Sequence, residues 1–125
     1  MVIRIEVSEA SLENEQLNLH IEEEQLSKLT EVKASDRMLA DSDALAFIYL
    51  IENNDSFIYI SIRNKYWEVL KQAHDNRFSV VLYENEKPLL TLSCFHEELD
   101  YLLANIKDNS NYGNEMVEAV AAQFR

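Results

Sequence analysis

Apolar and polar residues alternate in the first part of the chain, which is the pattern of strands with one buried face. Residues 3–7 and 17–21 place an apolar residue at every second position, and the side chains of a strand point alternately to its two faces. Both stretches therefore predict strands. Residues 8–15 are polar and predict a connection, a short strand is predicted around 37–40, and 22–30 fits either a helical turn or a loop.

Two pairs of apolar segments predict β-hairpins. Residues 44–51 are almost entirely apolar, which is typical of a central strand covered on both faces. Turn-forming polar residues follow at 52–56, and β-branched and aromatic residues follow at 57–62. The segments 78–83 and 89–92 flank a second polar turn in the same way. We therefore expect two antiparallel hairpins.

Three other segments carry the hydrophobic period of an amphipathic helix, in which apolar residues recur every three or four positions. They are 66–73, 95–106 and 116–124. Asn64 and Ser93 precede the first two segments, and both are residue types that cap helix N-termini. We expect helices over all three segments.

Together these patterns predict an α+β fold, a mostly antiparallel sheet of about six strands with three amphipathic helices packed against it. The chain of 125 residues fits one domain over 1–125. Its hydrophobic fraction of 47% is too high for a disordered protein.

Single occurrences of two residue types exclude several classes of protein. Gly113 is the only glycine, so the glycine-rich loops that bind nucleotide phosphates are absent. Cys94 is the only cysteine, which excludes an internal disulfide and a multi-cysteine zinc site and suits a reducing compartment. The N-terminus lacks a signal-peptide pattern, and the longest apolar run, 44–51, is far shorter than the ~20 residues of a membrane helix. We expect a cytoplasmic protein without a cofactor.

The net charge of −12 is unevenly distributed along the chain. Residues 1–62 contain 13 acidic and 4 basic residues, whereas residues 63–125 contain 10 acidic and 7 basic residues. This charge repels nucleic-acid phosphates and anionic lipids, so we expect neither nucleic acid nor membrane as a partner. The excess of acidic residues either keeps the protein soluble, which is the favoured interpretation, or forms an acidic face that binds a basic partner.

The most specific motif lies near the C-terminus and consists of Asn109, Asn111, Tyr112, Gly113, Glu115 and Val117. The further motifs are Asp41-Ser-Asp-x-Leu45-x-Phe47-x-Tyr49, Phe57-Ile-Tyr59, Trp67-Glu68 and Glu97-Glu98-x-x-Tyr101-Leu102-x-x-Asn105-Ile106. This combination resembles the YjbL-like family of small, uncharacterised proteins from Bacillus-type bacteria (Firmicutes), over roughly residues 38–124. The resemblance implies a cytoplasmic protein of unknown function and transfers no catalytic residue.

Asp41 and Asp43 precede the predicted central strand and share one face of it, where two carboxylates could hold a hard cation such as Mg²⁺. Glu52 and Asp55 lie at the opposite end of that strand. They are about 30 Å away at ~3.3 Å per residue and cannot join the pair. The alternative, which we favour, is an Asx-type turn that caps the strand.

Cys94 and the three histidines can each have either a purely structural role or a role in catalysis or metal binding. A helix N-terminus lowers the pKa of a thiol, but no base or oxyanion site is spaced to make Cys94 a nucleophile. A small residue partly buried at a strand-to-helix turn is the favoured interpretation of Cys94. His20, His74 and His96 fall on three elements without zinc-site spacing, so solvated side chains are expected unless the fold brings them together.

Asn111, Tyr112 and Gly113 form the most distinctive loop of the sequence, between two predicted helices. Glycine suits a positive φ or a close backbone approach, and tyrosine offers an apolar ring with a polar tip. One interpretation is a ligand-binding loop. The favoured one is a helix–helix corner with Asn111 capping the last helix.

These features support two hypotheses of function from different classes. The preferred one is a non-enzymatic binding or regulatory module acting through protein contacts, and the alternative is a small enzyme or metal-dependent ligand binder using Asp41, Asp43 and Tyr112. A weaker hypothesis is mimicry of nucleic-acid charge. The locally basic segment 63–77 fits either a solvated helix face or contact with an acidic partner or a second copy.

Overall fold

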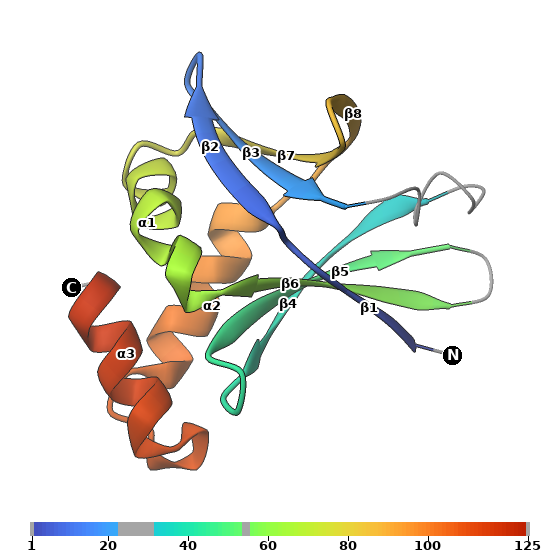
Figure 1. Ribbon diagram of the computed structural model, residues 1–125. Helices are drawn as coiled ribbons and strands as arrows, with labels where there is room; N and C mark the ends of the chain where they lie inside the picture. The colour runs from blue at the N-terminus through green and yellow to red at the C-terminus, as the bar shows by residue number, and fades with distance from the viewer. Residues whose placement is uncertain (1, 23–31, 54–55, 125) are drawn as a thin grey trace.

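The computed structural model describes residues 2–22, 32–53 and 56–124. The fold is α+β, with two four-stranded sheets and three α-helices in the described part of the chain (Figure 1). Most of the segment 22–30 and two positions of the predicted turn at 52–56 lie outside the described residues.

The first sheet has the strand order β1-β6-β5-β4. Its strands are β1 (Val2–Glu6), β4 (Lys33–Asp41), β5 (Ala46–Glu52) and β6 (Phe57–Arg63). The predicted hairpin of β5 and β6 is confirmed as an antiparallel pair in the interior of this sheet. The strand predicted around 37–40 is also confirmed, and it is longer because β4 continues through a bulge.

The second sheet has the strand order β2-β3-β7-β8. Its strands are β2 (Glu9–Glu13), β3 (Gln16–Ile21), β7 (Ser79–Glu84) and β8 (Lys87–Thr91). The predicted hairpin of β7 and β8 is confirmed. The prediction of a polar connection over 8–15 was wrong, because β2 forms a hairpin with β3 through Asn14 and Glu15, both at positive φ.

The expectation of one mostly antiparallel sheet of about six strands was only roughly right. β1 pairs parallel with β6, and β3 pairs parallel with β7, so both sheets are mixed. The chain changes sheet within one peptide: the amide of Val7 donates to Ser61 of the first sheet, and the amide of Ser8 donates to His20 of the second. Alternation within single strands does not encode this change of partner.

The three predicted helices are confirmed as α1 (Trp67–Asp75), α2 (Phe95–Ile106) and α3 (Asn114–Phe124). Two 3₁₀ turns, η1 (Asn64–Tyr66) and η2 (Ser110–Tyr112), precede α1 and α3. Figure 1 shows the helices together on one side of the sheets. No described helix has the length and apolar character needed to cross a membrane.

The two predicted N-caps were wrong. Asn64 begins the 3₁₀ turn η1, so the residue before α1 is Tyr66. The residue before α2 is Cys94, which adopts a left-handed conformation with φ 57° and makes no side-chain capping bond. The Ser93 hydroxyl instead donates to the carboxylate of Asp36 in the bulge of β4. A tertiary partner has therefore replaced the local cap.

One hydrophobic core receives side chains from both sheets and all three helices. At its centre the ring of Trp67 stacks on Phe47, with centroids 4.5 Å apart, and contacts Phe124 at 5.7 Å. The Trp67 indole N–H donates to the carbonyl of Ile62 at 3.2 Å. The prediction that the central strand is covered on both faces is confirmed, since Ala46–Ile51 of β5 are all buried.

Candidate functional site

Asp41 is held by three neighbours at the end of β4. Its Oδ2 atom lies 2.6 Å from the guanidinium of Arg4, and its Oδ1 accepts the backbone amides of Asp43 and Ala44 at 3.1 and 3.2 Å. These contacts make the Asx-type turn that the favoured interpretation described. A shallow cavity of about 290 Å³ lies beside Asp41 and Asp43, but Arg4 also lines it. A metal there would have to compete with the guanidinium for the Asp41 carboxylate.

The hydrogen bond from Arg4 lowers the pKa of Asp41 below the ordinary range of an aspartate. A carboxylate with a lowered folded-state pKa stabilises the fold at neutral pH, and that contribution is lost as the pH falls through the folded-state value. We expect Asp41→Asn to lower the free energy of unfolding by about 0.5–1 kcal/mol at neutral pH, because the pair is partly exposed. In urea denaturation experiments the difference should begin to shrink as the pH falls below about 4, the ordinary pKa of an aspartate, and should vanish only below the lowered folded-state pKa.

Asp43→Asn is the matched control for this measurement. The Asp43 carboxylate makes no hydrogen bond or ion pair with the other described residues, so its replacement should cost little free energy of unfolding. A difference for Asp41→Asn that is equal at neutral and acidic pH would show that its charge does not contribute.

Asn111, Tyr112 and Gly113 form the corner between α2 and α3. Gly113 has φ 86°, which confirms the positive φ expected for the only glycine. The carbonyl of Gly113 accepts the amide of Val117 in the first turn of α3. The side chain of Asn109 caps η2 by accepting the amide of Asn111. Capping by Asn111 is not seen, and a ligand-binding role for this loop stays a prediction.

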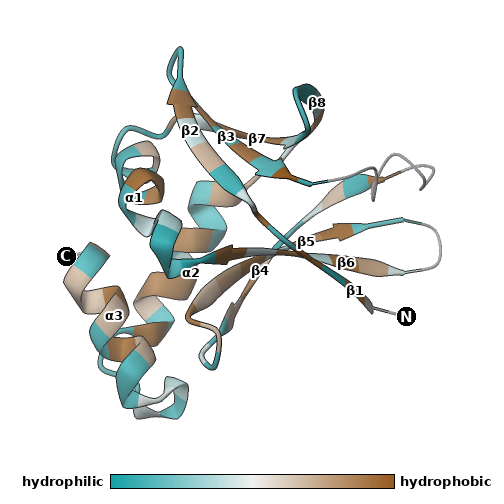
Figure 2. Cartoon of the chain, in the orientation of Figure 1, coloured by the Kyte–Doolittle hydropathy of each residue, from teal (hydrophilic) through white to brown (hydrophobic). Residues whose placement is uncertain are grey.

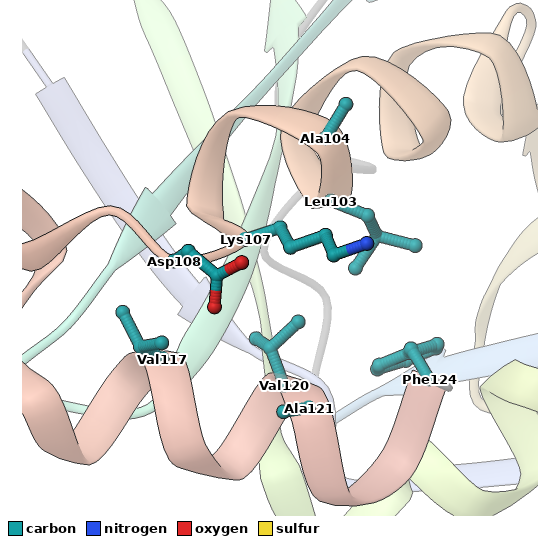
Figure 3. A pocket seen from close by; sticks show the side chains of 8 residues that line it. All are labelled: Leu103, Ala104, Lys107, Asp108, Val117, Val120, Ala121 and Phe124. Carbon is teal, nitrogen blue, oxygen red and sulfur yellow. The ribbon is translucent and has the colours of Figure 1, made fainter.

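A groove of about 280 Å³ runs between α2 and α3 (Figure 3). Its walls are apolar side chains, mainly Leu103 of α2 and Val117 and Phe124 of α3. Lys107 and Asp108 lie at the end of α2 and add one charge of each sign to the lining. The groove is built by the two helices that flank the corner, whereas Asn111, Tyr112 and Gly113 do not line it.

Cys94 is an exposed free thiol, so the expectation of a partly buried residue was wrong. Partial desolvation, followed by the nearby carboxylates of Asp36, Glu97 and Glu98, raises the pKa of this thiol. The carboxylates around the residue before α2 thus oppose any lowering of the thiol pKa by the helix N-terminus. This environment disfavours the thiolate and does not support a catalytic cysteine.

Residues of the basic segment 63–77 are largely paired within the chain. Arg63 lies 4.0 Å from Glu6, Lys71 lies 2.6 Å from Asp75, and Arg77 lies 2.9 Å from Asp100. These ion pairs leave little unbalanced positive charge for an acidic partner.

The outer face of the second sheet combines a wide groove with acidic side chains that form no ion pair with other described residues. We call it the acidic face, and define it by the residues that line a groove of about 790 Å³ over β2, β3 and β7. Four carboxylates line this groove, those of Glu9, Glu13, Glu22 and Glu86, and no lysine or arginine does so among the described residues. Figure 2 shows the underlying pattern, hydrophilic residues alternating with hydrophobic ones along β2 and β3.

Strand register places these side chains on one face. Leu17, Leu19 and Ile21 of β3 point into the core, so Asn18 and His20 point outward. Glu9 is paired with His20 and Ser11 with Asn18 across the β2–β3 hairpin, and Tyr83 of β7 is paired with His20 on the other side. The face therefore draws on three neighbouring strands.

Hydrogen bonds hold the floor of the acidic face. Asn18 is only 4% exposed, yet its amide donates to Glu13 at 3.3 Å and accepts from Gln16 at 2.6 Å. The His20 ring lies 5.2 Å from the Tyr83 ring, and its Nδ1 atom faces the carbonyl of Asn85 at 3.1 Å. A neutral His20 thus carries its proton on Nδ1 and offers Nε2 as an acceptor. Carboxylates, an acceptor nitrogen and aromatic rings together suit a cationic ligand.

Comparison with known proteins identifies the family of this chain. Residues 5–124 match UPF0738, a family of unknown function. The chain belongs to the UPF0738 family. This result confirms the resemblance to YjbL-like proteins, and no function is assigned to the chain through its relatives.

Relatives of this UPF0738 protein match over nearly their whole length. The chain is 46% identical to the UPF0738 protein YjbL of Bacillus subtilis over 121 residues, which is 97% of each chain. It is 50% identical to a UPF0738 protein of Bacillus velezensis and 44% identical to one of Bacillus licheniformis, with the same coverage. No solved structure matches the chain.

Two groups of residues in this UPF0738 protein were missed from the sequence. The acidic face was missed because β2 was not recognised as a strand, although Ala10 and Leu12 alternate there with polar residues. The second group consists of His74 and His96, whose Nδ1 atoms lie 2.9 Å apart. The sequence separation of 22 residues between them gave no signal of this contact.

Proposed function

We propose that this UPF0738 protein is a non-enzymatic binding or regulatory module whose acidic face receives a basic segment of a partner protein. The observation that carries the proposal is the set of four carboxylates around one groove without a lysine or arginine in its described lining. Carboxylates gathered on one face raise the local concentration of a positively charged partner and orient it on approach.

The charge of the acidic face is not neutralised within the described part of the chain. Glu9, Glu22 and Glu86 take part in none of the ion pairs between described residues, whereas Asp41, Asp75 and Asp100 do. The uneven charge of the sequence agrees with this picture, because β2 and β3 belong to its acidic first half.

The floor of the groove offers contacts that a basic side chain uses. The paired rings of His20 and Tyr83 present aromatic surface, to which lysine and arginine bind through cation–π interactions. Glu13 and Ser11 line the groove beside them and supply further polar groups, and the buried amide of Asn18 holds Glu13 in place. An extended basic segment can thus make both charged and polar contacts along the sheet.

The alternative functions have weaker support. The Asp41 carboxylate that a metal-dependent binder would use is occupied by Arg4 and two backbone amides. Self-association through the segment 63–77 would require breaking its ion pairs with Glu6, Asp75 and Asp100. We place the protein in the cytoplasm, where its free Cys94 stays reduced.

The proposal is tested with an oligolysine peptide as the probe and an oligoglutamate peptide of the same length as the control. We expect oligolysine to shift the backbone amide NMR signals of β2, β3 and β7, with Glu9, His20 and Tyr83 among the most affected, and oligoglutamate to shift none. Binding should weaken at least about tenfold between low and high salt, because exposed charges are screened. Shifts confined to the helices, or no shifts at all, would refute the proposal.

A further inference from the structure

Two histidine side chains meet between the last turn of α1 and the first turn of α2. The Nδ1 atoms of His74 and His96 lie 2.9 Å apart. The outer nitrogen of each ring also has a partner: His74 Nε2 lies 2.8 Å from Asp100 Oδ1, and His96 Nε2 lies 2.6 Å from the carbonyl oxygen of Phe78. His74 is only 7% exposed.

Counting protons shows what this arrangement requires. The carboxylate of Asp100 and the carbonyl of Phe78 are acceptors, so each outer nitrogen must carry a proton. The contact between the two Nδ1 atoms needs a proton as well, because two facing lone pairs at 2.9 Å repel each other. Three contacts therefore need three protons, whereas two neutral imidazoles carry only two between them.

We propose that His74 and His96 share one extra proton and form a singly charged pair that joins α1 to α2 and loosens when this proton is lost. The third proton lies between the two Nδ1 atoms and completes a continuous chain from Phe78 through both rings to Asp100. Loss of this proton at higher pH leaves one of the three contacts without a donor. The pair is thus a pH-sensitive connection between two helices that are distant in sequence.

Charged groups of two elements surround the His74 ring. Asp100 and His96 of α2 and Arg77, which follows α1, are the charged or titratable groups that face His74. Burial lowers the pKa of His74, Arg77 and His96 lower it further, and Asp100 opposes them. His74 Nε2 donates to Asp100 Oδ1, and the extra proton is shared between the two Nδ1 atoms. Arg77 holds the other oxygen of Asp100 at 2.9 Å.

A proton fits the gap between the rings better than a metal ion does. Two imidazole nitrogens bound tetrahedrally to zinc at about 2.0–2.1 Å lie roughly 3.3 Å apart, further than the 2.9 Å seen here. In addition, no group of three or more histidine, cysteine or acidic side chains in the described part of the chain could hold a metal ion. The separation is instead that of a hydrogen bond.

The test is NMR of the ring nitrogens in protein labelled with ¹⁵N-histidine, between about pH 5.5 and pH 9. Near neutral pH we expect one unprotonated nitrogen among the four of His74 and His96, and a second one as the pH is raised. His20→Gln simplifies the spectrum and removes only a histidine of the acidic face. Two unprotonated nitrogens in the pair throughout this range would overturn the proposal, as would stoichiometric binding of Zn²⁺ that shifts both rings.

Hydrogen exchange measures whether the connection loosens. When the third proton is lost, the amides in the last turn of α1 should exchange about tenfold faster, after correction for the intrinsic effect of pH, because a charged hydrogen bond is lost. This pH-dependent step should disappear in His96→Gln and persist in the His20→Gln control. Equal protection of these amides at all pH values in the unmodified protein would refute the pH-sensitive connection, whatever the variant does.

Discussion

Replacing Trp67 with alanine is expected to lower the free energy of unfolding by about 3–5 kcal/mol. The Trp67 side chain is 1% exposed, stacks on Phe47 at 4.5 Å and contacts Phe124 at 5.7 Å. Alanine leaves a cavity where β5, α1 and α3 meet, and it removes the indole hydrogen bond to Ile62. A domain of this size is stable by only about 5–15 kcal/mol, so this one change should consume much of its stability.

Trp67→Phe is the matched control, because phenylalanine keeps an aromatic ring against Phe47 and loses only part of the volume. Trp67→Phe should lower the free energy of unfolding clearly less than Trp67→Ala does. Both variants are measured by urea denaturation followed by circular dichroism. Fluorescence cannot be used, because both variants lack Trp67, the only tryptophan of the chain. Similar small losses for the two variants would show that the ring stack does not organise the core.

Elements with strong local patterns were predictable from the sequence. The run 44–51 is almost entirely apolar, and its strand β5 does lie in the interior of a sheet, buried on both faces. The stripe from Phe95 to Ile106 has the period of a helix over three turns, and α2 has these bounds. In both cases burial follows directly from the spacing of apolar residues.

The pairing of the strands could not be predicted in the same way. β2 has only two apolar residues, Ala10 and Leu12, among acidic and polar ones, so its alternation is weak. The split into two sheets depends on Val7 and Ser8 bonding to Ser61 and His20, which are distant in the sequence. Such contacts are decided by how the whole core packs and not by local propensity.

The candidate sites show the same limit. The Asx-type turn at Asp41 was predictable because a turn is local, but its partner Arg4 is 37 residues away. The uneven charge of the sequence indicated an acidic region, whereas the location of that region required β2 and β3 to be placed side by side. His74 and His96 were expected to be solvated, whereas the fold brings their rings into contact.

Reversing three charges on the acidic face is expected to weaken the binding of oligolysine by about 100-fold. Glu9, Glu22 and Glu86 are exposed and line the groove, so their replacement by lysine should leave the core unchanged. Each exposed ion pair contributes about 0.5 kcal/mol, and reversal replaces the attraction by a repulsion of similar size. Three reversals then amount to roughly 3 kcal/mol, which corresponds to that loss of affinity.

The control is a second triple variant with the same net charge, in which Glu68, Glu97 and Glu118 of the three helices become lysine. These residues are also exposed, but they lie outside the acidic face. If the face is a binding site, this control variant should retain most of its affinity for oligolysine. Its small loss of affinity should come only from the changed net charge, which acts at long range wherever the replaced residues lie. If both variants lose affinity equally, oligolysine responds only to the total charge of the chain, and the arrangement of carboxylates over β2, β3 and β7 has no part in binding.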